Sequence, residues 1–342
     1  MDRRRLLRLG AAGLGLMVSP SLNPLVAART SVKPAALLVP LSGPNAALGL
    51  SMQRAVALVQ ATGGKGPAPV TVHDTGGTAQ GAAQAAALAA RRGAPMILGP
   101  IFAAEVRAAA AATRLPILAF SNDESLRDSG VFLMGITASQ CVAAILGYAR
   151  RRGVRQVAMP PGEGLWGAQC AAAARSAAPD LGMELLVVAG SDPATLRAAN
   201  GGELPQALFV ADGGDRFLAA ARGVQGSGVQ LLGTVQALDA AAQRVADGAW
   251  IAAPDPAAFS GFARDYEQRN GSKPGAIAAL AYDAMQIAQA FAVTPKLDRG
   301  MLTQAAGFPG IAGAIRFRAD GSATRQLAIL VGAADGFAVA EG

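Results

Sequence analysis

Polar side chains stand just after several apolar runs of this sequence, where they could contact a small molecule. Ser121, Asn122 and Asp123 follow one run, Asp212 follows a second, and Gln236 lies just beyond a third. All five suit such contacts, but Asp, Asn and Ser are also favoured in turns and helix N-caps. Both roles remain open for each residue. If Asp123 and Asp212 share a site, they favour a cationic or polyhydroxyl ligand.

Two aromatic residues could form apolar walls for the same molecule. Phe102 precedes an Ala-rich helical stretch, and Trp166 lies in the segment GLWGAQCAAAA. A solute pocket needs an apolar wall beside a few fixed polar groups, and aromatic rings serve well as anchors. Ordinary core packing is the alternative role for both residues.

Patterns typical of catalysis and metal binding are absent from the sequence. The single histidine, His73, ends a predicted strand beside Asp74, which is typical of a packed or edge residue. No GxSxG elbow, phosphate loop or HExxH pattern occurs. Cys141 and Cys170 lack CxxC spacing, so with one histidine no zinc site is predicted. The sequence therefore predicts a protein that is not an enzyme and has neither metal nor cofactor.

The elements that position these residues centre on residues 94–123. Two short apolar runs, at 96–98 and 115–120, flank an Ala-rich stretch without internal Gly or Pro. This pattern predicts a β-α-β unit with a helix over 102–113. The turn at Gly99 and Pro100 would place the first amides of the helix at the carboxyl ends of the strands, where ligands of open α/β sheets bind.

Strands and helices alternate through most of the chain, and the alternation restarts near residue 139. Predicted strands lie near 35–41, 69–74, 131–134, 155–159, 184–189, 206–211, 229–233 and 250–253, with helices between them. Further helices are predicted near 257–269, 275–293 and 299–306, and short strands in the tail. Two runs of alternation predict an α/β fold with two doubly wound parallel-sheet lobes.

Residues 1–28 have the pattern of a signal peptide, with a basic start, a short apolar run and a small-residue end. Within them, residues 2–8 resemble the twin-arginine export pattern, with Asp2 where Ser or Thr is usual. A start-site error or a membrane anchor is the alternative. In an oxidising periplasm Cys141 and Cys170 could pair, but their spacing alone leaves this open.

Cleavage after Ala28 would leave 314 of the 342 residues, a length that suggests two domains. The high isoelectric point belongs partly to the leader, because residues 1–28 contain four arginines. Neither the remaining charge nor any cluster of basic and aromatic residues predicts nucleic-acid binding.

Several segments, in this order, carry a family resemblance. They are ALLVPLSGPNAALGLSMQRAVALV, MILGPIFAAEVRAAA, PILAFSND, GLWGAQCAAAA, ALFVADGGDRFLAAARGVQGSGVQLLGT, AYDAMQIA and FRADGS. In their order and spacing the chain resembles type I periplasmic binding proteins of the branched-chain amino-acid (Leu/Ile/Val) receptor group. The resemblance implies two lobes joined by three crossover segments: 34–134 plus 255–325, and 135–254 plus 326–342. It also implies a monomer that holds a small-molecule solute between hinged lobes and delivers it to an inner-membrane ABC permease.

The site positions differ from those of the amino-acid receptors. Phe102 and Ala103 stand where those receptors carry Ser at the head of the central helix, and Asp123 lies near the Thr that binds the ligand's carboxylate. Trp166 and Asp212 replace tyrosines, and Gln236 lies near the acidic residue that holds the ammonium group. A carboxylate at position 123 would repel another carboxylate, so the resemblance extends to the fold more than to amino-acid specificity.

The sequence leaves two further functional classes to consider, a regulatory protein and an enzyme. Relatives that activate penicillin-binding proteins use the same fold to regulate cell-wall synthases, and the changed ligand positions are compatible with such a role. Those activators are commonly lipoproteins, whereas this sequence has no cysteine at its leader junction. An enzyme is disfavoured by the absent motifs.

Overall fold

In the computed structural model, described residues are 32–62, 68–238, 247–275, 277–292, 294, 297–333 and 336–340. The predicted export signal, residues 1–28, lies outside this range. Within it, no helix has the length and apolar character needed to cross a membrane.

The first sheet is entirely parallel, with strand order β2-β1-β3-β4-β5. Its strands are β1 (Ala35–Val39), β2 (Val70–Asp74), β3 (Ile97–Leu98), β4 (Ile117–Ala119) and β5 (Phe132–Leu133). The helices associated with this sheet are α1 (Ala46–Thr62), α2 (Ala79–Arg91), α3 (Ala103–Ala112), η1 (Glu124–Leu126), α8 (Pro256–Asn270), α9 (Ala278–Ala290) and α10 (Arg299–Leu302). Continuous apolar runs suit such strands because both faces of a doubly wound sheet are buried.

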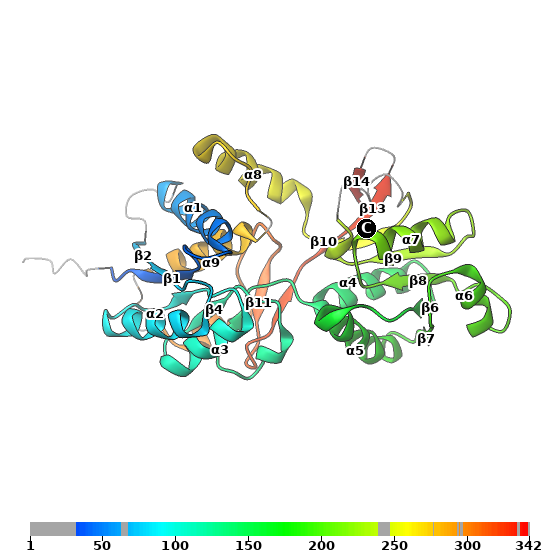
Figure 1. The fold of residues 1–342 in the computed structure, drawn as a ribbon, viewed down its shortest axis with the longest axis horizontal. Coiled ribbons are helices and arrows are strands. Elements are labelled where there is room, and N and C mark those ends of the chain that lie inside the picture. The colour runs from blue at the N-terminus through cyan, green and yellow to red at the C-terminus, as the bar shows by residue number, and fades with distance from the viewer. Residues whose placement is uncertain are drawn as a thin grey trace, which may run out of the picture. The chain divides into compact units, whose positions relative to one another are not determined.

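Alternate side chains of β1 enter two different cores. Leu37 and Val39 pack with residues of α1 and α9, whereas Ala36 and Leu38 pack with residues of α2 and α3. The helices α1 and α9 are far apart in sequence but lie against each other, as the blue and orange ribbons of Figure 1 show. The period of two along the strand thus supports a helix layer on each face of the sheet.

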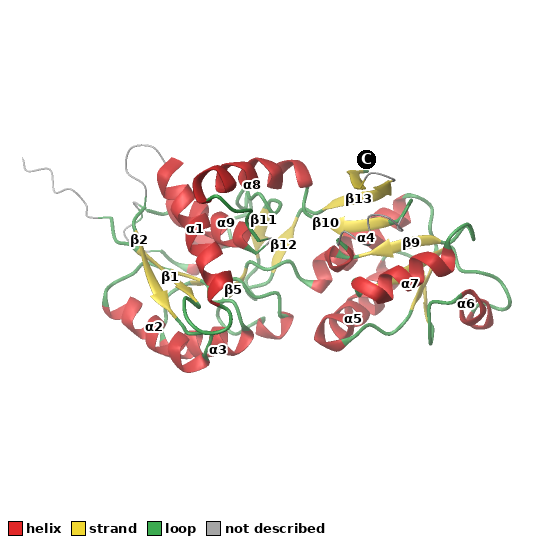
Figure 2. Ribbon diagram, turned by 45° about the horizontal axis from the view of Figure 1, so that its top comes forward, coloured by secondary structure: helices red, strands yellow, loops and turns green. Residues whose placement is uncertain are grey.

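The second sheet has the order β14-β13-β10-β9-β8-β6-β7. Its strands are β6 (Gln156–Met159), β7 (Glu184–Val187), β8 (Ala207–Val210), β9 (Gln230–Gly233), β10 (Trp250–Ala253), β13 (Ala328–Ala333) and β14 (Gly336–Val339). The helices associated with it are α4 (Ala138–Arg151), α5 (Gly164–Asp180), α6 (Pro193–Ala199), α7 (Gly214–Val224) and η2 (Val235–Ala237). Residues of α4 and α5 form the core on one face, and residues of α6 and α7 form the core on the other (Figure 2).

The chain passes between the two sheets three times, after β5, after β10 and after the hairpin β11 (Ile315–Phe317) and β12 (Ala323–Arg325). These passages agree with the α/β fold of two parallel-sheet lobes and three crossover segments that the sequence predicts. The exact lobe boundaries remain a prediction.

Two details differ from the sequence prediction of parallel sheets and of a helix near 299–306. The strand β13 is antiparallel to both β10 and β14. Only two residues separate β13 from β14, and strands so close in sequence can pair only in the antiparallel direction. The helix expected over 299–306 ends at Leu302, and its short span contains Gly300 and is followed by Thr303, both poor helix formers.

Candidate functional site

The carboxyl edge of the first sheet carries five of the predicted site residues. Phe102 is the N-cap of α3 and Ala103 is its first residue, while Ser121, Asn122 and Asp123 follow β4. The hydroxyl of Ser121 is buried and accepts a hydrogen bond from the Asp123 N–H at 3.2 Å. Asn122 is exposed, whereas Phe102 packs against the core formed with α1 and α9. Two of the five therefore have structural roles that compete with ligand contact.

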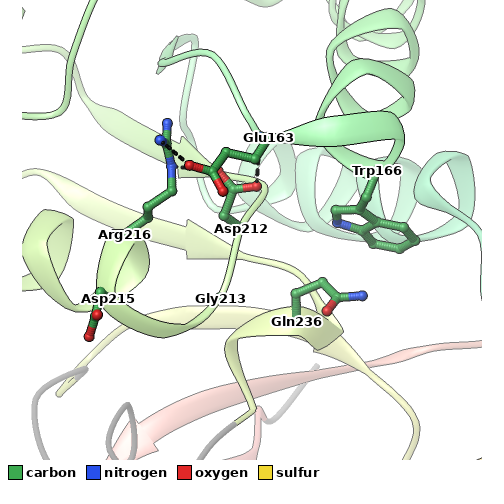
Figure 3. A pocket seen from close by; sticks show the side chains of 7 residues that line it. All are labelled: Glu163, Trp166, Asp212, Gly213, Asp215, Arg216 and Gln236. Carbon is green, nitrogen blue, oxygen red and sulfur yellow. Dashed lines mark hydrogen bonds and ion pairs between the residues drawn. The ribbon is translucent and has the colours of Figure 1, made fainter.

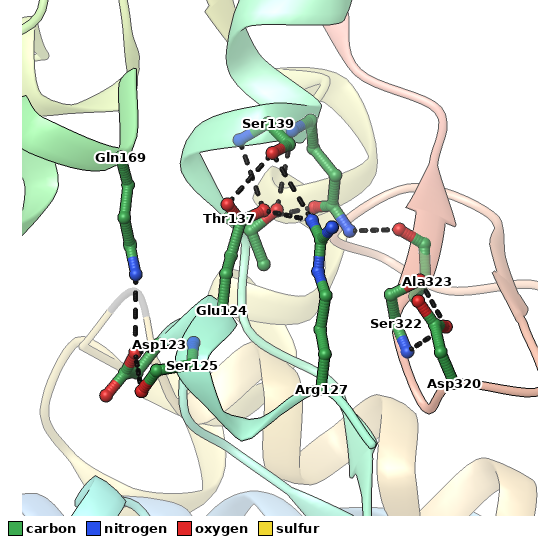
Figure 4. Close-up of polar contacts among 11 residues, drawn as sticks. Asp123, Glu124, Ser125, Arg127, Thr137, Ser139, Gln169, Asp320, Ser322 and Ala323 are labelled. Atoms are coloured by element: carbon green, nitrogen blue, oxygen red, sulfur yellow. Dashed lines mark hydrogen bonds and ion pairs between the residues drawn. The ribbon is translucent and has the colours of Figure 1, made fainter. Parts of the chain in front are cut away.

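Asp123 is held by several donors at once. Its Oδ1 accepts hydrogen bonds from the N–H and the hydroxyl of Ser125, at 2.9 and 2.7 Å, and from Gln169 Nε2 at 3.3 Å (Figure 4). The guanidinium of Arg107 lies 3.9 Å from its Oδ2. Burial raises the pKa of Asp123, but these hydrogen bonds and Arg107 outweigh it, so the net pKa is lowered. The carboxylate is thus ionised at neutral pH and already bonded within the protein.

A second polar group fixes the passage between β5 and α4. Glu124 accepts hydrogen bonds from the Ser139 hydroxyl and from Arg127, both at 2.8 Å (Figure 4). The next residue of α4 is Gln140, whose Nε2 donates to the carbonyl of Ala323 in β12 at 2.8 Å. Contacts of this kind tie two of the three crossover segments to each other.

The second sheet has a hollow of about 490 Å³ at its carboxyl edge (Figure 3). The residues that line it are Glu163, Trp166, Asp212, Gly213, Asp215, Arg216 and Gln236. They come from the segments that follow β6, β8 and β9, three neighbouring parallel strands. Parallel strands bring these segments to one edge, which is the usual ligand position in open α/β sheets.

Trp166 presents an aromatic surface to this hollow. Its indole Nε1 donates to the carbonyl of Ala211 at 3.0 Å, and the ring is half-buried against the core formed by α4 and α5. Because the polar end of the ring is bonded inward, the rest of the indole is left for apolar or cation–π contact.

Arg216 joins two carboxylates at the rim of the hollow. Its Nε lies 2.9 Å from Asp212 Oδ2, and its Nη1 lies 2.9 Å from Glu163 Oε1 (Figure 3). Asp212 also accepts from the Glu163 N–H at 3.0 Å, which fixes the start of α5 relative to the end of β8. The lining contains one guanidinium and three carboxylates, those of Glu163, Asp212 and Asp215, so the rim is acidic overall.

Gly213 allows two loops of the hollow to touch. A Cβ atom at this position would lie 1.8 Å from the carbonyl oxygen of Gln236. Such a distance is far inside van der Waals contact, so only glycine permits this approach. The position of Gln236 at the rim therefore depends on the absence of a side chain at 213.

The other chemically active side chains are packed away from this hollow. His73 is buried, next to the Thr71 hydroxyl, and burial together with Arg92 lowers its pKa. Cys141 and Cys170 are free thiols without solvent exposure, so the possible disulfide is not formed. Burial raises the pKa of Cys141 to about 12 and also raises that of Cys170. Among the described residues, no group of His, Cys, Asp and Glu could hold a metal ion.

Of the predicted site residues, the structure brings Trp166, Asp212 and Gln236 together around one hollow. Asp123 lies apart from that lining but contacts α5 through Gln169. Phe102, Ala103, Ser121 and Asn122 share the edge of the first sheet and do not line the hollow. Ligand binding by any of these residues stays a prediction.

Four further residues at these sites were not predicted from the sequence: Glu163, Asp215, Arg216 and Gln169. The spacing of Asp212 and Arg216 carried a signal, because residues four apart near the start of a helix face each other. No sequence signal could have identified Gln169, because its partner, Asp123, is distant in sequence.

Comparison with known proteins gives a family match. Residues 34–336 match the sequence model of a family described as periplasmic binding protein. No curated protein sequence matches the chain.

Several solved structures are similar. A putative branched-chain amino acid ABC transporter protein from Rhodospirillum rubrum has a TM-score of 0.76 and 23% identity, over 90% of this chain and 100% of that one. The leucine-binding protein LivK from Thermotoga maritima has a TM-score of 0.60 and 19% identity, over 91% and 98%. The C-domain of LpoA from Haemophilus influenzae, a regulator of PBP1A, has a TM-score of 0.71 and 15% identity, over 90% and 100%. At these identities the similarity shows a shared fold.

Proposed function

The chain belongs to the periplasmic binding protein family, and from that premise we propose that it captures a small polar solute, an amino acid or related compound, and delivers it to an inner-membrane ABC transporter. The neighbours from Rhodospirillum rubrum and Thermotoga maritima support a transport role. In this proposal the protein binds its solute without chemical change, acts as a monomer, and reaches the periplasm through its twin-arginine-like leader.

One observation carries the proposal. A hollow with an aromatic wall and several fixed polar groups lies at the carboxyl edge of the second sheet. Solute sites of proteins have this composition, an apolar surface plus a few convergent polar groups. The polar groups are fixed before any solute arrives, since Arg216 holds Asp212 and Glu163 in place. Pre-organised groups reduce the entropy lost on binding.

The charge of the hollow narrows the class of solute. The carboxylates that line the hollow outnumber its single guanidinium, that of Arg216. This guanidinium is already paired with Asp212 through Nε and with Glu163 through Nη1. An anionic solute would find no free cation among the lining residues. We therefore favour a solute with amino or hydroxyl groups, which could donate to Asp212 and stack on Trp166.

A second candidate function rests on the similarity to the LpoA C-domain, described as a regulator of PBP1A. In this alternative the same fold regulates a periplasmic cell-wall synthase, a penicillin-binding protein, and transport has no part. The TM-score of 0.71 over 100% of that domain favours keeping the alternative.

A thermal-shift screen of amino acids, polyamines, sugars and organic acids tests the two candidates. A solute present at a hundred times its dissociation constant stabilises the folded protein by about 2.7 kcal/mol. We expect stabilisation by at least one amino- or hydroxyl-bearing solute. No shift with any solute, together with co-purification of a penicillin-binding protein, would replace the transport proposal with the regulatory one.

A further inference from the structure

The strand β7 forms an open edge of the second sheet. It pairs in parallel with β6 and with no other described strand. The N–H groups of Glu184 and Val188 donate to β6-side carbonyls, at 2.7 and 3.1 Å. Since residues of a strand alternate in the direction of their main-chain groups, those of Leu185 and Val187 point away from the sheet. These two residues therefore offer unused hydrogen-bonding groups to another strand.

A second hollow of about 300 Å³ lies beside this edge. It is bounded by the end of β6, one side of α5 and the side chains of Leu185 and Val187. Val187 is 61% exposed, the largest exposure among the large apolar residues of the described chain. The residues that line this second hollow are separate from those that line the hollow at Trp166.

Small residues create the space between α5 and the edge. A Cβ atom at Gly167 would lie 2.2 Å from the main chain of Gly162, so the first turn of α5 rests directly on the loop after β6. Beyond that contact, α5 presents only Ala168 and Ala171 toward the hollow until Arg175. A helix with larger side chains here would fill the groove.

Apart from its short length, the edge lacks the usual protection against pairing. Natural edge strands are commonly blocked by charged residues, proline or a covering segment. In β7 only Glu184 is charged, at the first position, and Leu185, Leu186 and Val187 follow. The strand is short, with four residues, but its three apolar residues leave an open edge of the kind to which another strand can add.

Arg175 supplies the charge that selects the occupant. It is exposed, it is the one charged residue that lines the hollow, and it forms no ion pair with any described residue. A carboxylate is the group that a free guanidinium recognises best.

We propose that β7 binds an extended peptide segment of a partner protein, which adds as a strand and carries an apolar side chain for the hollow and a carboxylate for Arg175. Main-chain hydrogen bonds to Leu185 and Val187 supply affinity, and the groove with Arg175 supplies selectivity. This inference goes beyond solute binding and does not depend on it, because the two hollows share no lining residue.

The test uses a fluorescein-labelled peptide of about eight residues, the length of an ordinary strand, with alternating valine and threonine and a free carboxyl-terminal aspartate. Fluorescence anisotropy measures its binding to the intact protein. We expect saturable binding that weakens about tenfold in Val187→Lys and in Arg175→Glu. The same peptide with alternate amides N-methylated should not bind, because it cannot form the ladder.

Val339→Lys is the matched control, since Val339 is an exposed valine, at 48%, on the edge strand β14 at the other end of the same sheet. Its affinity for the peptide should equal that of the unmodified protein. Because the substituted side chains are exposed, circular dichroism should show unchanged folding in all three variants. Absence of binding, or equal affinity in Val187→Lys and Arg175→Glu, overturns the proposal. So does a dimer in sedimentation that Val187→Lys dissociates, because a second copy would then occupy the edge.

Discussion

At the scale of single residues, Trp166 is the clearest candidate for a binding anchor. Its ring is oriented by the hydrogen bond to Ala211, so it does not need to be ordered when a solute binds. Trp166→Ala should weaken the binding of the solute found by the screen by at least about 1 kcal/mol, roughly fivefold in dissociation constant. Isothermal titration calorimetry measures this change directly.

Leu165→Ala provides the matched control for that experiment. Leu165 is the neighbour of Trp166, is 58% exposed, and does not line the hollow. Its substitution should leave the affinity unchanged. If Trp166→Ala also leaves it unchanged while the protein stays folded, the indole is not part of the site.

Gly213 gives a prediction about stability. In Gly213→Ala, the new methyl group must displace the Gln236 carbonyl, from which it would lie only 1.8 Å away. We expect the free energy of unfolding to fall by about 1–3 kcal/mol, the usual cost of overpacking. Gly261→Ala in α8 is the control, because nothing lies within 4 Å of its Cβ position. It should be neutral or stabilising by about 0.5–1 kcal/mol, and urea denaturation that found equal losses in both variants would contradict the argument.

The sequence predicted some residues of this site but not others, and a physical reason separates the two groups. Asp212 and Gln236 were predictable because they follow apolar runs, and parallel strands bring such positions to one edge. The ion pairs of Arg216 and the contact between Asp123 and Gln169 were not, since they depend on how loops and helices approach in space. Phe102 was predicted as a possible ligand wall but packs against the core formed with α1 and α9. Its sequence position could not decide between these roles, because an aromatic residue at a helix start suits both.

At the scale of elements, a buried ion pair joins α9 to the hairpin strand β12. Arg325 Nη1 lies 3.6 Å from Asp283 Oδ2, and both side chains are almost fully buried. Arg325 also donates to the carbonyls of Met134 and Gly313, at 2.7 and 3.0 Å. Asp283 accepts from two backbone N–H groups of the 311–312 turn. This pair therefore connects the crossover after β5 with the one after β12.

Removing the cation should cost more at neutral than at acidic pH. Burial raises the pKa of Asp283 to about 6 even though Arg325 and two backbone N–H groups lower it. In Arg325→Met that pKa rises further, so the folded protein must bury an unpaired charge or bind a proton. A carboxyl whose pKa is higher in the folded state stabilises folding most below its unfolded pKa, and this contribution is lost as pH rises through the folded pKa.

We expect Arg325→Met to lower the free energy of unfolding by about 3–5 kcal/mol at pH 7, and by less below about pH 4, where Asp283 is protonated in either state. Urea denaturation of both proteins at the two pH values measures the difference. The control is Arg318→Met, an exposed arginine near the same hairpin, which should change stability by less than about 0.5 kcal/mol. An equal loss at both pH values would show that Asp283 does not titrate in this range.

The element boundaries show which parts of the fold follow from sequence. The helices α6 and α7 lie between the predicted strands near 184–189, 206–211 and 229–233, as the alternation of strands and helices predicts. The direction of β13 was not predictable from its own residues. It follows from the hairpin β11–β12 and from pairing with β10, a contact between segments far apart in sequence.

At the scale of the whole molecule, a hydrogen bond between Gln169 and Asp123 connects the layers of the two sheets at the candidate site. Gln169 belongs to α5, which covers the second sheet, and Asp123 follows β4 of the first. In proteins with hinged lobes, ligands act by shifting an equilibrium between arrangements of the lobes. A contact between the lobes that stabilises the solute-binding arrangement therefore raises the affinity for the solute, even though the contact does not touch the solute.

Gln169→Glu should open the lobes by placing a second carboxylate opposite Asp123, whose lowered pKa keeps it ionised. Loss of the hydrogen bond alone, in Gln169→Ala, removes about 1 kcal/mol and shifts the equilibrium several-fold. We expect small-angle X-ray scattering to give a larger radius of gyration for Gln169→Glu than for the unmodified protein at neutral pH, with Gln169→Ala between them. The dissociation constant of the solute should rise from the unmodified protein to Gln169→Ala and then to Gln169→Glu.

Gln84→Glu is the control, since it makes the same charge change on the exposed side of α2, and it should alter neither the radius of gyration nor the dissociation constant. A radius and an affinity that do not respond to Gln169→Glu would mean that this contact does not hold the lobes together, and that closure depends on the crossover segments and the solute alone.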